Sequence, residues 1–271
     1  MGSGIGKGVA GGEITLLTPT DTILKTGEKR TIDGVELEFQ MVPETEAPSE
    51  MNVYLPAART FLAAEIATCT LHNILTPRGA KVRDALAWSQ YLGEAVNLYA
   101  GRSDTIVSSH CWPRFGQKEV ESWLSGHRDN YRYLHDQTVR LMNKGLNGDE
   151  IAASLKLPPE LAKEWYDRPY YGSLSFNSRA VYQFYMGWYD ANPANLAPMP
   201  PRDTGKRYVA AMGGAAKVKA MAREAYDAGD YAWAAELLNH VVMSDSADAE
   251  DRKSTRLNSS HPSLSRMPSS A

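Results

Sequence analysis

The stretch VELEFQM at residues 35–41 alternates apolar side chains with acidic or amide side chains, with a period of two. This alternation is typical of a β-strand that buries one face and exposes the other. Asp33 and Gly34 directly precede the stretch and favour a two-residue hairpin turn that pairs it with residues 29–32. Three more short strands are expected, at residues 51–55, 60–64 and 105–109. The sequence therefore predicts a sheet in the first part of the chain.

The periodicity becomes helical after Trp112 and Pro113 and stays helical. Residues 117–143 carry apolar and aromatic side chains at spacings of three and four, and Gly145 is a natural end for that helix. Further helices are expected at residues 177–190, 203–212, 214–228 and 230–242. Residues 222–234 look like half of a tetratricopeptide-type hairpin, but one copy does not make a solenoid. The fold class predicted is therefore α+β.

The composition of the chain excludes several classes of protein. Of 271 residues, 43% are hydrophobic and 23% are charged, which is typical of a globular protein, and the formal net charge is -3. This balance gives no support to nucleic-acid binding or to a polybasic membrane patch. No apolar run is long enough to cross a bilayer. Two cysteines cannot form a disulfide framework or a cysteine-rich zinc site.

The two ends of the chain differ from the rest. Residues 1–12 include six glycines and are expected to be a flexible lead-in. The last 28 residues, 244–271, include nine serines and have no apolar periodicity, so we expect them to be disordered. Within this tail, RKSTRLNSSH at residues 252–261 resembles translated sequencing-adapter text, which predicts an artefactual end and a natural protein that continues past about Val242.

Acidic and histidine side chains stand where the predicted strands begin or end. Glu46 and Glu50 flank the turn before residues 51–55, Glu65 follows one strand, and His110 follows another. Such side chains at the ends of neighbouring strands suit a divalent metal with oxygen and nitrogen ligands. Glutamates in such places are more often solvated, and a single histidine is more often structural. Both interpretations remain open on these residues alone.

A polar loop, HNILTPRG at residues 72–79, follows directly, and Arg83 lies shortly beyond it. Two arginines and an amide suit a tetrahedral oxyanion, because guanidinium groups donate hydrogen bonds in pairs. The alternative is that Arg78 and Arg83 form surface ion pairs with Asp84 or Glu94. On spacing alone, the surface pairs are the favoured interpretation.

Two histidines and an aromatic cluster stand in the helical half. His127 and His135 lie among apolar neighbours of one predicted helix and are interpreted as buried or helix-face structural residues. The aromatic side chains between residues 166 and 189 form either a packed core or an apolar surface for a second subunit or an apolar substrate. They are Tyr166, Tyr170, Tyr171, Phe176, Tyr182, Phe184, Tyr185, Trp188 and Tyr189.

Seven motifs, in order, resemble the alkyl sulfatases of the metallo-β-lactamase superfamily, and the resemblance runs from about Gly4 to about Val242. The motifs are ETEAPSEMN (44–52), AE (64–65), TLHN (70–73), RGAKVRD (78–84), SHCWP (109–113), YLHDQT (133–138) and GWYDANPA (187–194). The resemblance implies the C-terminal half of a metallo-β-lactamase-type αββα domain over residues 13–115. It also implies an all-α dimerisation domain over residues 116–243.

The resemblance further implies hydrolysis of alkyl sulfate esters, for example dodecyl sulfate, to alcohol and sulfate by two zinc ions and a homodimeric enzyme. Its metal-ligand positions fall on Glu46, Glu65 and His110. Zinc lowers the pKa of bound water toward neutrality and so provides a nucleophile. Its sulfate-binding positions fall on Asn73, Ile74, Leu75, Thr76, Pro77, Arg78 and Arg83. No residue of the chain indicates its compartment, so the location is unknown from the sequence; the family resemblance is compatible with a periplasmic or secreted location.

Three departures from the family pattern set further expectations. The His-x-His-x-Asp-His run that supplies most zinc ligands is absent and is expected upstream, which predicts an incomplete and inactive copy. Phe176 stands in the motif Ser175-Phe176-Asn177 where members often have a histidine, so the general acid is unidentified. The sterol-carrier-like C-terminal domain is also absent. The alternatives are a non-catalytic helical dimerisation module and a different metallo-β-lactamase-fold hydrolase, and the Arg78 and Arg83 pair argues against the latter.

Overall fold

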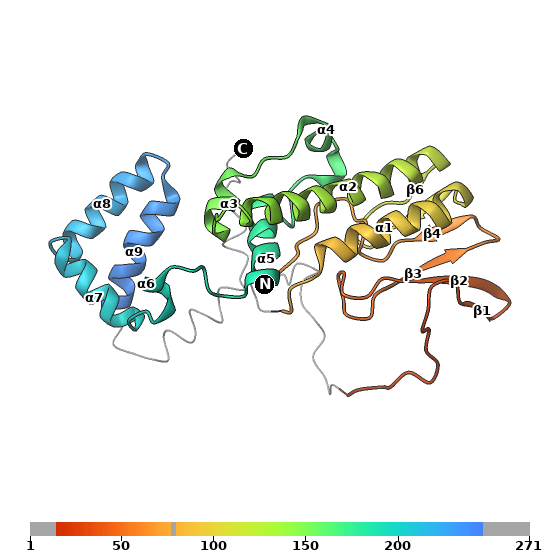
Figure 1. Ribbon diagram of the computed structural model, residues 1–271, viewed down its shortest axis with the longest axis horizontal. Coiled ribbons are helices and arrows are strands. Elements are labelled where there is room, and N and C mark those ends of the chain that lie inside the picture. The colour runs from red at the N-terminus through yellow and green to blue at the C-terminus, as the bar shows by residue number, and fades with distance from the viewer. Residues whose placement is uncertain (1–14, 77–79, 246–271) are drawn as a thin grey trace. The chain divides into compact units, whose positions relative to one another are not determined.

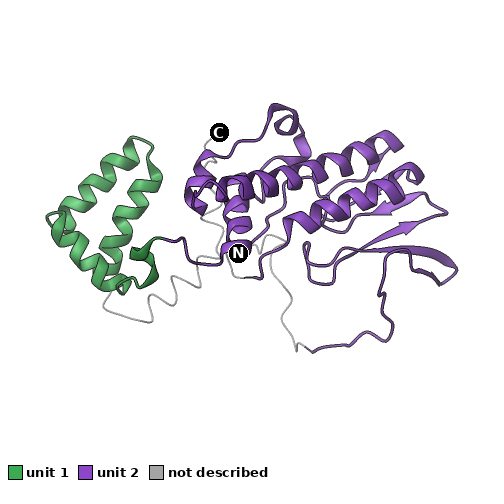
Figure 2. Ribbon diagram, in the orientation of Figure 1, with its two compact units in different colours: residues 1–13, 192–271 green, residues 14–191 purple. Residues whose placement is uncertain are grey.

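The protein is described by a computed structural model in which residues 15–76 and 80–245 are placed (Figure 1). The chain divides into two compact units, one of residues 14–191 and one that contains residues 192–245 (Figure 2). The lead-in predicted at residues 1–12 and residues 246–271 of the predicted tail lie outside the described residues. The first two residues of that tail, Ser244 and Asp245, were expected to be disordered but belong to the last described helix of the chain. The domain boundary expected after residue 115 stays a prediction.

The first unit holds a sheet of six short strands in the order β1-β2-β3-β4-β5-β6. The strands are β1 (Lys29–Ile32), β2 (Val35–Met41), β3 (Met51–Leu55), β4 (Thr60–Leu62), β5 (Thr105–Val107) and β6 (Arg114–Phe115). All neighbours pair antiparallel except β4 and β5, which are parallel. Asp33 and Gly34 connect β1 and β2 with φ of 50° and 81°, which confirms the predicted hairpin.

All described helices of the same unit follow β4 in the chain. Its helices are α1 (Ala85–Tyr99), η1 (Ala100–Arg102), α2 (Gln117–Met142), α3 (Gly148–Ser154), α4 (Pro159–Ala162), η2 (Trp165–Asp167) and α5 (Leu174–Met186). Helix α1 was not predicted from the sequence. Asp84 begins this helix, because its carboxylate accepts hydrogen bonds from the amides of Leu86 and Ala87 at 2.9 and 3.0 Å.

Helices α1 and α2 lie side by side and cover one face of the sheet (Figure 1). Phe61 of β4 and Ile106 of β5 face these helices and are 0% and 1% exposed. Trp88 and Tyr99 of α1 and Leu124 of α2 meet them in one continuous core and are fully buried. Burial of this apolar surface fixes the strands that carry the candidate site against the two long helices.

Several predicted elements are confirmed with shifted ends. Strand β3 has the predicted bounds, whereas β4 and β5 are each two residues shorter than predicted. The helix predicted at residues 117–143 is α2, and Gly145 follows it with φ of 87°. Helix α5 begins earlier than predicted because the Ser173 hydroxyl accepts a hydrogen bond from the Phe176 amide, and it ends at Gly187 with φ of 74°.

The second unit is helical, as predicted. It consists of α6 (Pro193–Leu196), α7 (Pro201–Ala211), α8 (Ala215–Asp227) and α9 (Tyr231–Asp245). Its small core is formed by Val209, Val218, Ala222, Leu237 and Val241. Gly205 allows α7 to approach α9 closely, since a side chain there would meet the His240 carbonyl oxygen at 2.8 Å.

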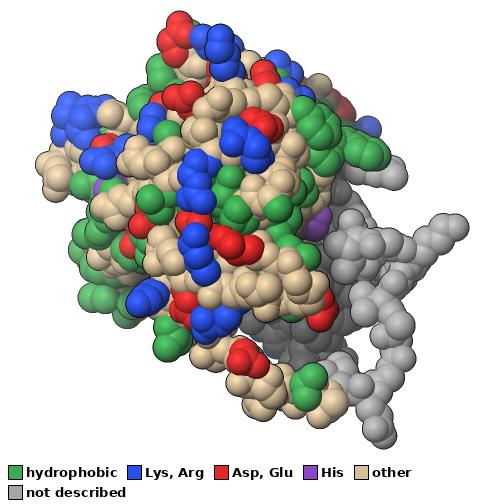
Figure 3. Space-filling model, turned by 90° about the vertical axis from the view of Figure 1, so that its right-hand side faces the viewer, with side chains coloured by type: hydrophobic (Ala, Val, Ile, Leu, Met, Phe, Trp, Pro, Cys, Tyr) green, Lys and Arg blue, Asp and Glu red, His purple; other side chains and the backbone are tan. Residues whose placement is uncertain are grey.

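The face of the first unit nearest β1 and β2 carries basic and acidic side chains side by side (Figure 3). Lys29 of β1 lies 3.5 Å from Glu36 of β2, and Arg102 lies 2.9 Å from Glu38. Because these basic side chains lie next to acidic ones, they do not form an extended surface of one charge. Among the described residues, no helix combines the length and the apolar character that a bilayer crossing needs.

Candidate functional site

The parallel pairing of β4 and β5 brings Glu65 and His110 together. Leu62 pairs with Val107 at the ends of the two strands, and each site residue follows its strand by three positions. Because parallel strands end at the same edge of a sheet, the two side chains leave the sheet side by side. The imidazole Nε2 of His110 lies 3.0 Å from Oε1 of Glu65.

The backbone at this edge is held in an uncommon conformation. Ala64 and His110 have φ of 41° and 65°, in the left-handed region that residues other than glycine rarely adopt. The Ser109 amide donates a 2.8 Å hydrogen bond to the Ala64 carbonyl, and a disulfide joins Cys69 to Cys111. Strain of this kind persists where surrounding contacts enforce it, and it concentrates at functional sites.

His72 joins this pair from the following loop and was not predicted as a metal ligand. Its Nε2 lies 3.2 Å from Oε2 of Glu65, and its Nδ1 lies 3.0 Å from the Asn73 carbonyl oxygen. Since a carbonyl accepts, Nδ1 donates, and in the neutral ring the lone pair of Nε2 faces a carboxylate. Burial lowers the pKa of His72, and the positive charge of Arg83 adds to that effect. Because the neutral Nε2 has no proton to donate to the carboxylate, the two groups can both coordinate a cation but cannot form a hydrogen bond with each other.

Glu46 completes the cluster from the loop between β2 and β3. Ligand atoms of Glu46, Glu65 and His72 all lie within 4.8 Å of one another. Two carboxylates and an imidazole are a donor set that zinc accepts. The chemistry of these residues therefore fits a divalent metal, with His110 next to Glu65 as a fourth candidate ligand.

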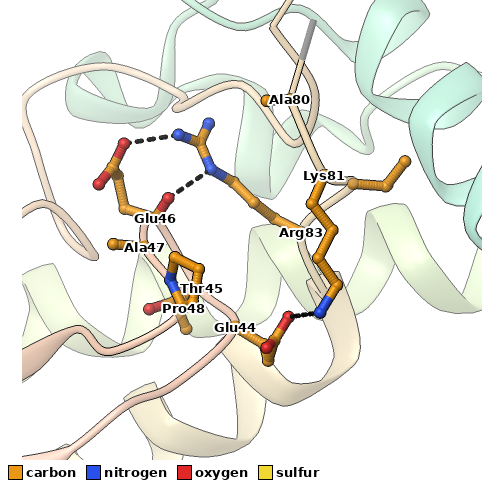
Figure 4. A pocket seen from close by; sticks show the side chains of 9 residues that line it. Glu44, Thr45, Glu46, Ala47, Pro48, Ala80, Lys81 and Arg83 are labelled. Carbon is orange, nitrogen blue, oxygen red and sulfur yellow. Dashed lines mark hydrogen bonds and ion pairs between the residues drawn. The ribbon is translucent and has the colours of Figure 1, made fainter.

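Arg83 holds Glu46 in this position (Figure 4). Its Nη2 donates to Oε1 of Glu46 at 2.5 Å, and its Nε donates to the Glu46 carbonyl at 2.8 Å. Its Nη1 donates to the Asn73 carbonyl at 2.9 Å. The ion pair of Arg83 is therefore with Glu46, not with Asp84 or Glu94, and all three guanidinium nitrogens donate within the site.

The pKa values of the neighbouring carboxyl groups Glu65 and Glu50 shift in opposite directions. Burial raises the pKa of Glu65, but the hydrogen bond and the charge of His110 oppose burial, and the pKa lies below its usual range. Burial raises the pKa of Glu50, and the nearby charges of Glu46 and Glu65 add to the increase. Glu50 accepts a 3.1 Å hydrogen bond from the Glu65 amide, so it acts on the backbone that carries the ligand.

The loop predicted to bind sulfate lies beside the cluster. Asn73 and Ile74 are buried, Leu75 is half-buried, and Thr76 is 2% exposed. The Thr76 hydroxyl has no hydrogen-bond partner among the described residues. Pro77 and Arg78 lie outside the described residues.

Asn177 of α5 fixes the start of this loop. Its amide nitrogen donates to the His72 carbonyl at 2.9 Å, and its oxygen accepts from the Ile74 amide at 3.0 Å. Gly172 packs against the same segment, where a side chain would meet the His72 carbonyl oxygen at 2.5 Å. Asn177 was not predicted as a site residue. Its partners lie 105 and 103 positions away in the chain, and no local pattern links them to it.

The remaining predicted residues fall into two groups. His127 and His135 are 0% and 8% exposed, as the structural interpretation predicts. The aromatic cluster divides, because Tyr166 and Tyr182 are buried, whereas the others that the structure exposes are Tyr170, Tyr171, Phe176, Phe184, Tyr185 and Trp188. The packed core is therefore confirmed for Tyr166 and Tyr182, and a surface for a second subunit or an apolar substrate stays a prediction for the exposed side chains.

Comparison with known proteins identifies relatives along most of the chain. Residues 147–260 match the alkyl sulfatase dimerisation family. An (R)-specific secondary-alkylsulfatase of Pseudomonas sp. is 51% identical over 239 residues, which cover 88% of this chain and 36% of that protein. The alkyl/aryl-sulfatase BDS1 of Saccharomyces cerevisiae is 43% identical over 250 residues, 92% of this chain and 39% of the relative.

A solved structure agrees with these relatives. The stereoselective inverting sec-alkylsulfatase Pisa1 from Pseudomonas sp. has a TM-score of 0.84 and 51% identity, over 88% of this chain and 38% of that chain. The α+β class with a helical dimerisation region is therefore confirmed. The chain spans little more than a third of the length of these relatives.

Proposed function

We propose that this chain, which belongs to the alkylsulfatase family, supplies part of a zinc centre that hydrolyses sulfate esters of alkyl chains to alcohol and sulfate. The observation that carries the proposal is Glu65, whose two carboxylate oxygens lie 3.0 Å from His110 and 3.2 Å from His72. The His72 side chain is 2% exposed and that of Glu65 29% exposed, so a cation between this carboxylate and the neutral imidazole would balance a charge that water reaches only in part.

Glu46, Glu65 and His110 are the proposed ligands, and His72 is added by its geometry. A bound zinc ion supplies a Lewis acid and a nucleophile at neutral pH. Four candidate ligands would complete one tetrahedral site but not two. We therefore expect this chain alone to release no measurable sulfate from an alkyl sulfate.

The other side chains of the site orient the ligands. Arg83 fixes Glu46 through hydrogen bonds to its carboxylate and its carbonyl, and Nη1 of Arg83 donates to Asn73. Glu50 holds the Glu65 backbone. These contacts preorganise the ligands before a metal arrives, which reduces the reorganisation that binding requires.

Sulfate would be held by the segment from Asn73 to Arg78. The buried Thr76 hydroxyl is free to donate to a sulfate oxygen, since no described residue bonds it. In this proposal Arg78 supplies the charge that balances sulfate. The contacts of Arg83 favour a role on Glu46 over direct sulfate binding.

A chimera tests the proposal. In this chimera, the matched part of this chain replaces the corresponding part of the Pseudomonas secondary-alkylsulfatase, over the 239 residues of the match. The zinc-dependent release of sulfate from a secondary alkyl sulfate is then measured. The chimera should be active, and Glu65→Gln should lower its rate by at least about 100-fold, beyond the loss expected for a residue that only orients a ligand. Glu36→Gln on β2 is the matched control and should leave the rate unchanged.

A folded, zinc-loaded chimera without activity would contradict the proposal. An active Glu65→Gln chimera would contradict the assignment of the ligand. Circular dichroism and zinc content of each variant separate these outcomes from a failure to fold.

We propose also that the helical region of residues 116–243 forms a homodimer contact. The family match supports this, and so do exposed apolar side chains of the second unit, of which Trp233 is 45% and Val242 56% exposed. Light scattering of the full chain after size exclusion should give twice the monomer mass, and Trp233→Ser should shift it toward the monomer. A monomer at micromolar concentration would contradict the dimer.

We propose a periplasmic or secreted location. The disulfide between Cys69 and Cys111 supports it, because disulfides persist in oxidising compartments. Alkylation of thiols in the purified native protein should leave both cysteines unmodified, and modification of both would remove this support.

A further inference from the structure

The segment between Glu65 and His72 runs under helices α1 and α2 and presents three consecutive carbonyl groups to them. The indole Nε1 of Trp88 donates to the Ile66 carbonyl at 2.9 Å. The indole Nε1 of Trp123 donates to the Ala67 carbonyl at 2.7 Å. Loop carbonyls usually bond water or backbone, so three in a row bonded by rings of two helices is an uncommon arrangement.

The third carbonyl, that of Thr68, is bonded by His127 of α2. The Nε2 of His127 lies 2.7 Å from the Thr68 carbonyl oxygen, and its Nδ1 lies 2.8 Å from the Trp123 carbonyl oxygen. Carbonyl oxygens only accept, so each ring nitrogen must carry a proton to make its bond. A neutral imidazole carries one proton, and the pair of contacts therefore requires the imidazolium form.

A buried carboxylate stands beside this ring. His127 is 0% exposed and Asp167 is 2% exposed, and Nε2 of His127 lies 3.6 Å from Oδ1 of Asp167. Neither carboxylate oxygen of Asp167 has a hydrogen-bond partner among the described residues. An uncompensated charge is costly in such a place, so each ion provides the charge that the other needs.

The other ionisable groups near the pair are few. The ring of Tyr166 stacks on His127 with centroids 5.1 Å apart, and Tyr166 donates to the Ser122 carbonyl. Burial raises the pKa of Asp167, the charge of His127 and the neighbouring Asn130 amide oppose this, and Glu164 and Asp129 add to the increase. Of these groups, His127 alone can be a cation.

We propose that His127, held as an imidazolium by Asp167, is a positioning residue that fixes the backbone between Glu65 and His72. It acts through the Thr68 carbonyl and together with the indoles of Trp88 and Trp123, and it touches neither candidate ligand. Glu65 directly precedes the bonded carbonyls, and His72 follows them by four residues. The effect on metal binding rests on the proposed function, whereas the charged pair does not.

Nitrogen NMR of the full chain with labelled histidine tests the charge state. Both ring nitrogens of His127 should carry protons at neutral pH, as its contacts with two carbonyl oxygens require. Asp167→Asn keeps the shape but removes the charge, and at neutral pH His127 in this variant should lose one of its two ring protons. A His127 with one ring proton at neutral pH in the unaltered chain would overturn the proposal.

Zinc titration of the same chain tests the positioning. His127→Phe keeps the stacked ring but removes both donors, and it should weaken zinc binding by roughly 10- to 100-fold, as loss of a residue that orients a ligand does. His135→Phe is the matched control, on the same helix and nearly as buried but bonded to Tyr185 and Asp136, and it should leave zinc affinity unchanged.

Equal losses in the two variants would overturn the positioning role. If the unaltered chain binds no zinc, the proposed function is contradicted. The proposal that His127 and Asp167 form a buried ion pair is then still tested by the number of ring protons on His127. Hydrogen exchange of residues 66–72 then replaces zinc as the measure of positioning. Exchange there should be faster in His127→Phe than in His135→Phe, and equal rates would overturn the role.

Discussion

Methionine in place of Arg83 keeps an unbranched side chain but removes every hydrogen bond that the guanidinium donates. Those bonds reach the Glu46 carboxylate at 2.5 Å, the Glu46 carbonyl at 2.8 Å and the Asn73 carbonyl at 2.9 Å. Arg83 is 9% exposed, so water replaces few of them. The substitution therefore tests whether this arginine organises the site.

The size of the effect follows from these contacts. A hydrogen bond to a charged group contributes about 1.5–3 kcal/mol, and removing one partner of a buried ion pair costs about 3–5 kcal/mol. The Glu46 side chain is 26% exposed, so solvent stabilises part of the carboxylate charge that Arg83 leaves behind. We expect Arg83→Met to lower the free energy of unfolding by about 2–4 kcal/mol.

Urea unfolding followed by near-ultraviolet circular dichroism measures this loss. Lys81→Met is the matched control, because Lys81 pairs with Glu44 in the same region but its side chain is 71% exposed. An exposed pair contributes little, so the control should change stability far less. Equal losses in Arg83→Met and Lys81→Met would refute the role of Arg83 in organising the site.

Three further predictions concern single side chains of the first unit. The hydrogen bond from Arg102 holds the pKa of Glu38 below its usual range, so this pair stabilises the fold above about pH 4.3 and the contribution is lost as the pH falls through the lowered value. In acid titrations followed by circular dichroism, Glu38→Gln should remove that part of the pH dependence, and an unchanged profile would contradict it. Asn177→Leu should destabilise the protein by about 2 kcal/mol in urea, because it leaves the buried Ile74 amide and His72 carbonyl unpaired; a neutral result would show that the loop does not depend on α5. Burial raises the pKa of Tyr99 to about 12, so ultraviolet titration should show an ionisation step near that pH that is absent in Tyr99→Phe; the same step in the variant would contradict the assignment.

Strand β2 could be predicted because apolar and polar side chains alternate along residues 35–41 and Asp-Gly before them is a common two-residue hairpin turn. The expected burial of its apolar face alone was wrong, because Glu38 and Gln40 are 8% and 0% exposed, whereas Val35 is 50% exposed. Arg102 pairs with Glu38, and Asn52 and Glu94 bond the Gln40 amide, so these polar side chains are buried with partners. The ends of β4 and β5 could not be predicted, because the left-handed conformation of Ala64 is imposed by its neighbours and not by its own side chain. Local pattern determines a strand, whereas tertiary contacts decide where it ends.

Helix α1 shows what period alone can miss. Ala85, Trp88, Leu92, Ala95 and Tyr99 are buried and follow each other at spacings of three and four, and Asp84 caps the helix. This spacing is typical of a helix that buries one face. Recognition of the aspartate as a helix cap would have found the helix.

The candidate ligands illustrate the same division. Glu65 and His110 could be predicted as neighbours because both follow strands, and the parallel register brings them together. His72 could not be predicted as a neighbour of Glu65, because the connection between them has no periodic pattern and turns back through contacts with α2 and α5. The pairing of Arg83 with Glu46 likewise crosses 37 residues of chain and has no local signal.

Zinc titration of the full chain tests the central claim most directly. The unaltered protein should bind zinc, and Glu65→Gln should abolish binding, because Glu65 contacts both His110 and His72. Glu36→Gln, with an exposed carboxylate on β2, should bind zinc like the unaltered protein. Equal zinc affinity of the Glu65→Gln and Glu36→Gln variants would contradict the assignment of the metal site.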